Sequence, residues 1–240
     1  MISNMIAPRS EANIYAPMHR QLNALDGISD PRLREILRET LEAINATVMA
    51  NFLLLVVQRL EPLTQKTASE PLHLSKNFGT HSIFSSGMIL NDVLEIARSP
   101  EKSNHMRNQT LVGLCCALEN GIKQIADHLN ISIPTKSKDI ESYPVRIWAG
   151  IRDYYQELGG GEDSRGFEDN CLRRLQTIFW VRNSIVHKDA EWPSILDGYH
   201  KFWKKTDYIQ TEYETIDAII QWIDNELLHS WSDLDTILKR

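Results

Sequence analysis

Apolar residues recur at spacings of three and four along most of this chain, and no segment alternates apolar and polar residues as a half-buried strand does. This periodicity constrains the fold most strongly, because each segment then has one apolar stripe that must pack against other helices. With 240 residues, 42% of them hydrophobic, the chain has enough apolar material for a sizeable core. We therefore predict an all-α protein.

The periodicity divides the chain into two predicted parts. Residues 1–100 are expected to form an N-terminal helical extension, with a long helix over about 30–61, a linker over about 62–82 and a helix over about 84–98. Asp30 can cap the long helix, Pro31 suits its first position, and Pro62 is expected to stop it. Residues 105–240 are expected to form a second helical domain, with helices over 108–129, 142–158, 167–187 and 211–238. This second part predicts a four-helix unit.

Composition limits the function in several ways. The net charge of −6 means that any RNA or DNA contact must come from a local basic patch. The three cysteines have no metal-ligand spacing and are expected to be reduced thiols. The N-terminal residues lack the apolar core of a secretory signal, and the longest apolar run, 52–57, is too short to span a bilayer. We expect a soluble, cytoplasmic protein with no membrane contact.

One stretch places chemically useful side chains together near the end of the predicted helix 167–187. Arg182 is a permanent cation, Asn183 an amide and His187 a proton carrier, and all three follow a strongly apolar run. On a helical wheel Arg182 lies near the middle of the apolar stripe, while Asn183 and His187 share one edge of it. A guanidinium on an apolar face needs either a buried carboxylate or a surface other than the core.

Two interpretations of Arg182 follow. In the structural one, Arg182 pairs with an acid such as Glu119 on a neighbouring helix, and His187 merely ends its own helix. In the functional one, this face meets a second subunit and leaves a polar cleft for a substrate. The residues alone leave both interpretations open.

The stretch 179–187, FWVRNSIVH, resembles the Arg-x(4–6)-His signature of the HEPN superfamily, in which a polar residue directly follows the arginine. The resemblance covers roughly residues 105–235. It implies a HEPN-like four-helix bundle and a metal-independent endoribonuclease with Arg182, Asn183 and His187 at the catalytic site. It further implies a homodimer in which paired motifs form a composite site. A role in antiviral defence, in a toxin–antitoxin pair or in RNA processing would follow, with an antitoxin or regulatory protein as a possible partner.

The residue types suit this chemistry. Metal-independent cleavage uses the ribose 2′-hydroxyl as nucleophile, so the substrate is RNA and the products carry a 2′,3′-cyclic phosphate and a 5′-hydroxyl. Histidine can transfer both protons near neutral pH, and arginine offers a planar fork of donors to phosphate oxygens. We expect no metal and no cofactor, because no carboxylate cluster, P-loop, GxGxxG, CxxC, HExxH or GxSxG motif stands out.

The reaction needs two proton transfers, but each motif supplies one histidine. A homodimer that brings two motifs across a two-fold axis would supply both and would explain why Arg182 lies on an apolar stripe. We therefore predict a dimer. The alternatives are a non-catalytic helical module that binds a nucleotide, RNA or a protein partner through the same cleft, and a scaffold in which Arg182 is only salt-bridged.

Weaker signals lie on either side of the motif. Lys188 follows His187, and a basic, aromatic segment over 199–205 includes Lys201, Trp203, Lys204 and Lys205. These five residues are candidate RNA contacts, because bases can stack on aromatics while lysines meet phosphates. The preferred alternative is that the aromatic residues of the segment pack inward.

The other histidines give weaker evidence of a functional site. His128 and His229 are expected to be surface or packing residues. Arg98 and His105 repeat a looser arginine-then-histidine pattern, but the polar residues between them, starting with Ser99 and Pro100, predict a loop. We therefore assign no site to that pair.

Overall fold

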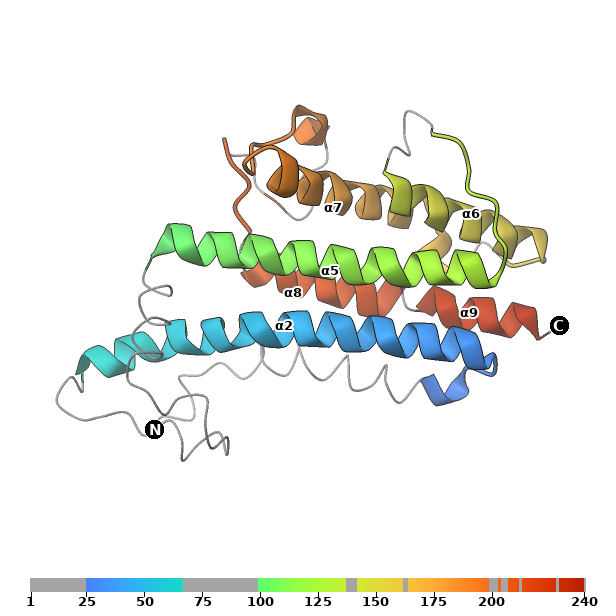
Figure 1. The fold of residues 1–240 in the computed structure, drawn as a ribbon, viewed down its shortest axis with the longest axis horizontal. Coiled ribbons are helices and arrows are strands. Elements are labelled where there is room, and N and C mark those ends of the chain that lie inside the picture. Colours follow the sequence, from blue (N-terminus) through green and yellow to red (C-terminus); the bar gives the residue numbers. More distant parts are fainter. Residues whose placement is uncertain are drawn as a thin grey trace.

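The computed structural model describes residues 25–66, 99–136, 142–161, 164–198, 203, 207–211, 213–227 and 229–239. Its α-helices are α2 (Pro31–Lys66), α5 (Pro100–His128), α6 (Tyr143–Glu157), α7 (Asp169–His187), α8 (Tyr213–Trp222) and α9 (His229–Leu238) (Figure 1). Short helical turns occupy Leu25–Gly27, Arg165–Phe167, Ser194–Gly198 and Ile223–Leu227. The described residues contain no β-strand, so the prediction of an all-α protein is confirmed. The helix predicted over 84–98 lies outside them.

Helix α5 is the centre of the arrangement. It packs against α2, α6, α7 and α8, and α2 and α7 both run antiparallel to it (Figure 1). The buried apolar residues of α2 belong to the same hydrophobic core as those of α5 to α9. The described part of the predicted N-terminal extension thus shares its core with the predicted second domain.

The long contact between α2 and α5 depends on two glycines of α5. A Cβ atom on Gly121 would lie 2.2 Å from Thr40 Oγ1, and one on Gly113 would lie 2.7 Å from Thr47 Cγ2. Both distances are far below van der Waals contact, so only glycine lets the two helices approach this closely. Each threonine hydroxyl donates to a carbonyl of its own helix, to Ile36 and Ala43 respectively, at 2.8 Å.

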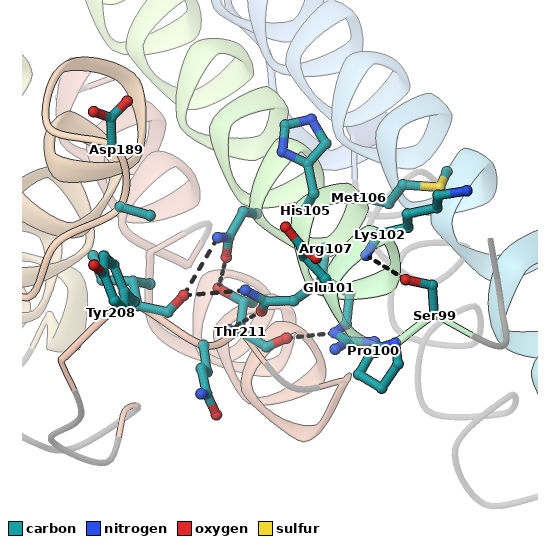
Figure 2. A pocket seen from close by; sticks show the side chains of 15 residues that line it. Ser99, Pro100, Glu101, Lys102, His105, Met106, Arg107, Asp189, Tyr208 and Thr211 are labelled. Atoms are coloured by element: carbon teal, nitrogen blue, oxygen red, sulfur yellow. Dashed lines mark hydrogen bonds between the residues drawn. The ribbon is translucent and has the colours of Figure 1, made fainter.

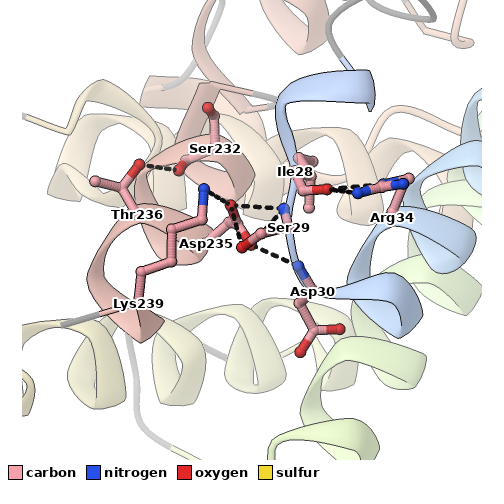
Figure 3. Close-up of polar contacts among 8 residues, drawn as sticks. All are labelled: Ile28, Ser29, Asp30, Arg34, Ser232, Asp235, Thr236 and Lys239. Atoms are coloured by element: carbon pink, nitrogen blue, oxygen red, sulfur yellow. Dashed lines mark hydrogen bonds and ion pairs between the residues drawn. The ribbon is translucent and has the colours of Figure 1, made fainter.

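A polar cluster joins the beginning of α2 to the end of α9 (Figure 3), and through His128 also to the end of α5. The Asp235 carboxylate, 2% exposed, accepts hydrogen bonds from the backbone N–H groups of Ser29 and Asp30 at 3.1 and 3.0 Å. Lys239 Nζ lies 2.7 Å from the same carboxylate. Asp30 caps α2 by accepting from Leu33 N at 2.8 Å, as predicted, and its other oxygen lies 3.0 Å from His128 Nε2. His128 therefore has a structural partner.

Three helix boundaries differ from prediction. Helix α2 continues through Pro62 to Lys66, so the predicted end at residue 61 is too early. Helix α5 begins at Pro100 and not at 108, so the loop predicted between Arg98 and His105 is wrong from Pro100 onward. The region predicted as one helix over 211–238 contains a π-helical turn at Ile223–Leu227 between α8 and α9.

The early start of α5 has a clear physical reason. Ser99 caps the helix by accepting from Lys102 N at 3.3 Å, and Pro100 takes the first position. The residues that follow are polar and lack an apolar stripe, yet Ser103 and Asn108 are buried. Asn108 binds Thr211 and not a core side chain. The pattern of apolar residues therefore did not predict the first part of the helix, residues 100–107.

Among the described residues, no helix combines the length and apolar character needed to cross a membrane.

Candidate functional site

Arg182 lies on α7 at the border between its buried and exposed faces. Cys171, Leu175 and Ile178, which share its side of the wheel, are fully buried, whereas the Arg182 side chain remains 23% exposed. Towards the end of the helix this side opens to the surface: Ile185 is half-buried and Val186 is 46% exposed. The apolar stripe of α7 is therefore covered in its first half and open beside the motif.

The guanidinium of Arg182 is held loosely. Nη1 donates to Asn183 Oδ1 at 2.9 Å, while Nη2 lies 3.9 Å from Glu119 Oε2, beyond hydrogen-bond distance. Its Nε is buried and has no hydrogen-bond partner among the described residues. Glu119 also faces Lys123 Nζ at 3.3 Å, so one carboxylate serves two cations. The carboxylate expected from the sequence is present, but it leaves Arg182 with unused donor capacity.

Cys115 lies beside this group, on α5. Burial raises the pKa of the Cys115 thiol, and the nearby Arg182 charge opposes that effect without overcoming it. The thiol is therefore neutral near pH 7 and is a packing residue, not a nucleophile. Cys171, also buried, has a raised pKa for the same reason.

His187 is the last residue of α7 and is exposed. Within the described part of the chain its ring makes no hydrogen bond or ion pair, with Arg182 or with any other residue. The two residues lie about 7.5 Å apart along the helix axis, from the helical rise per residue. Asn183 lies between them: it shares an edge of the helix with His187 and holds the Arg182 guanidinium towards that edge.

The chain turns sharply after His187. Asp189 and Ala190 have φ angles of 49° and 61°, a region that residues other than glycine rarely adopt. Hydrogen bonds hold the turn in place, from Lys188 N and Ala190 N to Ser184 O at 2.9 and 3.2 Å. The Ser184 hydroxyl donates to Glu191 O, and Ser184 is 2% exposed. Ser184 thus anchors the turn, a role that sequence reasoning missed because it depends on contacts beyond the helix.

A pocket of about 1210 Å³ lies next to this turn (Figure 2). Its walls are the first turns of α5 from Ser99 to Asn108, the turn residues Asp189 and Ala190, and the segment 208–211. His105, which sequence reasoning set aside, lies in this wall. Arg182, Asn183 and His187 are not lining residues, but the motif helix ends at the edge of the pocket.

The candidate RNA contacts fall into three groups. Lys188 is exposed directly after His187. Trp203 is 3% exposed, so its ring is not available to a base and the inward-packing alternative describes it. Lys201, Lys204 and Lys205 lie outside the described residues.

Two further expectations concern histidines and metals. His229 is exposed on α9, as expected for a surface residue. Among the described residues, no group of three His, Cys, Asp or Glu side chains is arranged to hold a metal ion.

Comparison of the chain with protein-family models, with curated proteins and with solved structures finds no match.

Proposed function

We propose that this chain is a metal-independent endoribonuclease of the HEPN type. The HEPN-like four-helix bundle would comprise α5, α6, α7 and the α8–α9 pair, with α2 packed against it as an N-terminal extension. Its biological setting would be antiviral defence, a toxin–antitoxin pair or RNA processing, and an antitoxin or regulatory protein would restrain it.

The observation that carries this proposal is the state of the Arg182 guanidinium. Asn183 directs it towards the helix edge that bears His187, its Nε is unpartnered among the described residues, and Glu119 lies beyond hydrogen-bond distance. An arginine with spare donors beside an exposed histidine suits a phosphodiester, because the fork of donors matches two phosphate oxygens. A purely structural arginine would be expected to form a closer, bidentate pair with its carboxylate.

In the proposed reaction the 2′-hydroxyl attacks the adjacent phosphorus and the 5′-oxygen leaves. A histidine accepts the proton of the 2′-hydroxyl, and a second proton reaches the leaving oxygen. Arg182 stabilises the extra negative charge on the phosphorane oxygens, and Asn183 keeps the guanidinium in place. The products are a 2′,3′-cyclic phosphate and a 5′-hydroxyl.

A homodimer completes the proposed site. Each chain supplies one histidine from the motif, and two are needed for the two proton transfers. The open apolar surface of Ile185 and Val186 lies directly beside His187, where a second copy would bring its own motif close. RNA is the substrate of the dimer, and neither metal nor cofactor takes part.

The Glu119 contact supports a second candidate function. A carboxylate 3.9 Å from the guanidinium partly neutralises it, which would suit a non-catalytic helical module that binds a nucleotide, RNA or a protein. In that module Arg182 and His187 would only contact the ligand, and no bond would be broken.

Incubation of the purified chain with single-stranded RNA in EDTA distinguishes the endoribonuclease from the non-catalytic module. We expect cutting that survives chelation, yields cyclic phosphate ends and spares RNA with 2′-deoxy riboses. His187→Ala should reduce the rate by about 10²–10⁴-fold, the usual contribution of a proton-transfer group. His229→Ala, at another exposed histidine, is the matched control and should cut normally. Absence of cutting by the unmutated chain, with RNA or nucleotide binding that His187→Ala weakens, would favour the module.

A further inference from the structure

The carboxylate of Glu119 faces two cations, and a different oxygen makes each contact. Oε1 accepts a hydrogen bond from Lys123 Nζ, on the same helix, at 3.3 Å. Oε2 lies 3.9 Å from Arg182 Nη2, on α7, which is beyond hydrogen-bond distance. The carboxylate is therefore held on α5, and its contact with the motif arginine is the weaker of the two.

The geometry of α5 explains why Lys123 binds this carboxylate. Glu119 precedes Lys123 by four residues, so the two side chains lie on neighbouring turns of the same face. The order with the glutamate nearer the N-terminus is the favourable one for such a pair. The Glu119 side chain is only 22% exposed, which limits the screening of its charge by solvent. Pairing within α5 thus competes directly with pairing across to α7.

Tyr143, the first residue of α6, gives Lys123 a second contact. The Lys123 ammonium lies 5.3 Å from the centre of the Tyr143 ring, within the range of a cation–π interaction. The guanidinium carbon of Arg146 lies 5.4 Å from the same ring centre. Helix α5 packs against both α6 and α7 (Figure 1). Lys123 is thus the middle member of a chain of contacts that runs from Arg146 on α6 to Arg182 on α7.

Loss of the Lys123 side chain would change the surroundings of the motif arginine. Glu119 would then retain one cation contact among the described residues, the one to Arg182. Closure of that contact from 3.9 Å to about 2.8 Å would form a charge-assisted hydrogen bond. The Nη2 donor of Arg182 would be used and its charge partly offset, so the guanidinium would bind a phosphate less well.

We infer that Lys123 is a positioning residue for the motif: it holds Glu119 on α5 and so leaves the Arg182 guanidinium available to a phosphate of the RNA strand. Lys123 acts through Glu119 and not by its own contact with the strand, because its ammonium is already shared between a carboxylate and an aromatic ring. The nature of the ligand rests on the proposed function.

A double-mutant cycle on Lys123 and Glu119 tests this role. Every protein carries His187→Ala, so that a short fluorescent single-stranded RNA stays intact, and its dissociation constant is measured by anisotropy. Lys123→Met should weaken binding about three- to fivefold, the scale of a partly exposed ion pair. In the Glu119→Gln background the same substitution should have no such effect, because no carboxylate remains to close on Arg182. Lys123→Arg keeps the pair with Glu119 and should bind RNA normally.

Lys136→Met is the matched control. Lys136 is exposed in the segment after α5, so its replacement removes the same charge and leaves the Glu119 pair in place. Weakening by Lys136→Met as large as that by Lys123→Met would overturn the inference, because charge alone would explain both. Equal weakening by Lys123→Met with and without the Glu119 carboxylate, with a salt dependence lower by about one phosphate contact, would also overturn it, since Lys123 would then bind the strand directly.

The proposed function fails separately. If the unmutated chain does not cut RNA in EDTA but the cycle shows this coupling, in proteins with normal melting temperatures, the role of Lys123 stands. If the chain cuts RNA while Lys123→Met binds it normally, only the role of Lys123 falls. If the His187→Ala protein does not bind RNA, both fall.

Discussion

Replacement of Asp235 by alanine should destabilise the fold without changing Arg182, Asn183 or His187. The Asp235 carboxylate is 2% exposed and accepts from Ser29 N and Asp30 N while it faces Lys239 (Figure 3). The substitution leaves two backbone N–H groups without that acceptor, each worth about 1–3 kcal/mol when buried. Because these groups are only partly buried, we expect a loss of about 2–4 kcal/mol in the free energy of unfolding at pH 7.

The pH dependence of this loss provides a second check. Burial by itself raises the pKa of Asp235, but the contacts from Lys239, Asp30 and Ser29 outweigh it and hold the pKa below 3.8. A carboxyl with a lowered pKa in the folded state stabilises fully above its unfolded pKa and loses this effect as the pH falls through the folded value. The difference between Asp235→Ala and the unmutated chain should therefore be constant near neutral pH and shrink below about pH 4.

Urea unfolding followed by circular dichroism, repeated across this pH range, measures both effects. Thr236→Ala is the control, because it changes the next residue of α9 at an exposed position and should cost less than about 0.5 kcal/mol. A loss below about 1 kcal/mol in Asp235→Ala at pH 7, or a loss that stays the same at pH 3, would refute this account of the cluster.

Three further predictions concern the helix packing and the motif. Gly121→Ala should lower the free energy of unfolding by about 1–3 kcal/mol because its Cβ would meet Thr40, whereas Gly27→Ala, with open space around it, should cost far less in the same urea assay. Glu119→Gln should tighten RNA binding, measured by anisotropy in the His187→Ala background, since it removes the negative charge near Arg182; weaker binding would contradict a phosphate role for that arginine. Val186→Asp should convert the predicted dimer to a monomer in analytical ultracentrifugation and abolish cutting, and a cutting monomer would argue against the composite site.

Much of the helical content was predictable because its signals are local. The apolar repeats predicted α6 and α7 closely, and Asp30 and Pro31 marked the start of α2, where the cap is found. The same cap signal exists at Ser99 and Pro100, but the residues after it lack an apolar stripe, so the pattern predicted a loop. A polar segment can be helical when its buried side is polar too. Here the buried Asn108 accepts a hydrogen bond from Thr211, which lies 103 residues further along the chain.

The sequence by itself placed Arg182, Asn183 and His187 on one helix, because positions along a helix follow from its period of 3.6 residues. It also put Glu119 on a neighbouring helix as a possible partner. Only the tertiary structure decided the separation of that carboxylate from Arg182, the exposure of Val186 and the burial of Trp203.

The pocket depends on tertiary structure even more. His105, the Asp189 turn and the segment 208–211 lie far apart in sequence, and they meet through hydrogen bonds between polar groups that leave no periodic trace. Apolar periodicity determines which face of a helix is buried, since burial is non-directional and depends on area. Which polar groups meet is determined by directional bonds between distant segments, and these exist only once the helices have packed.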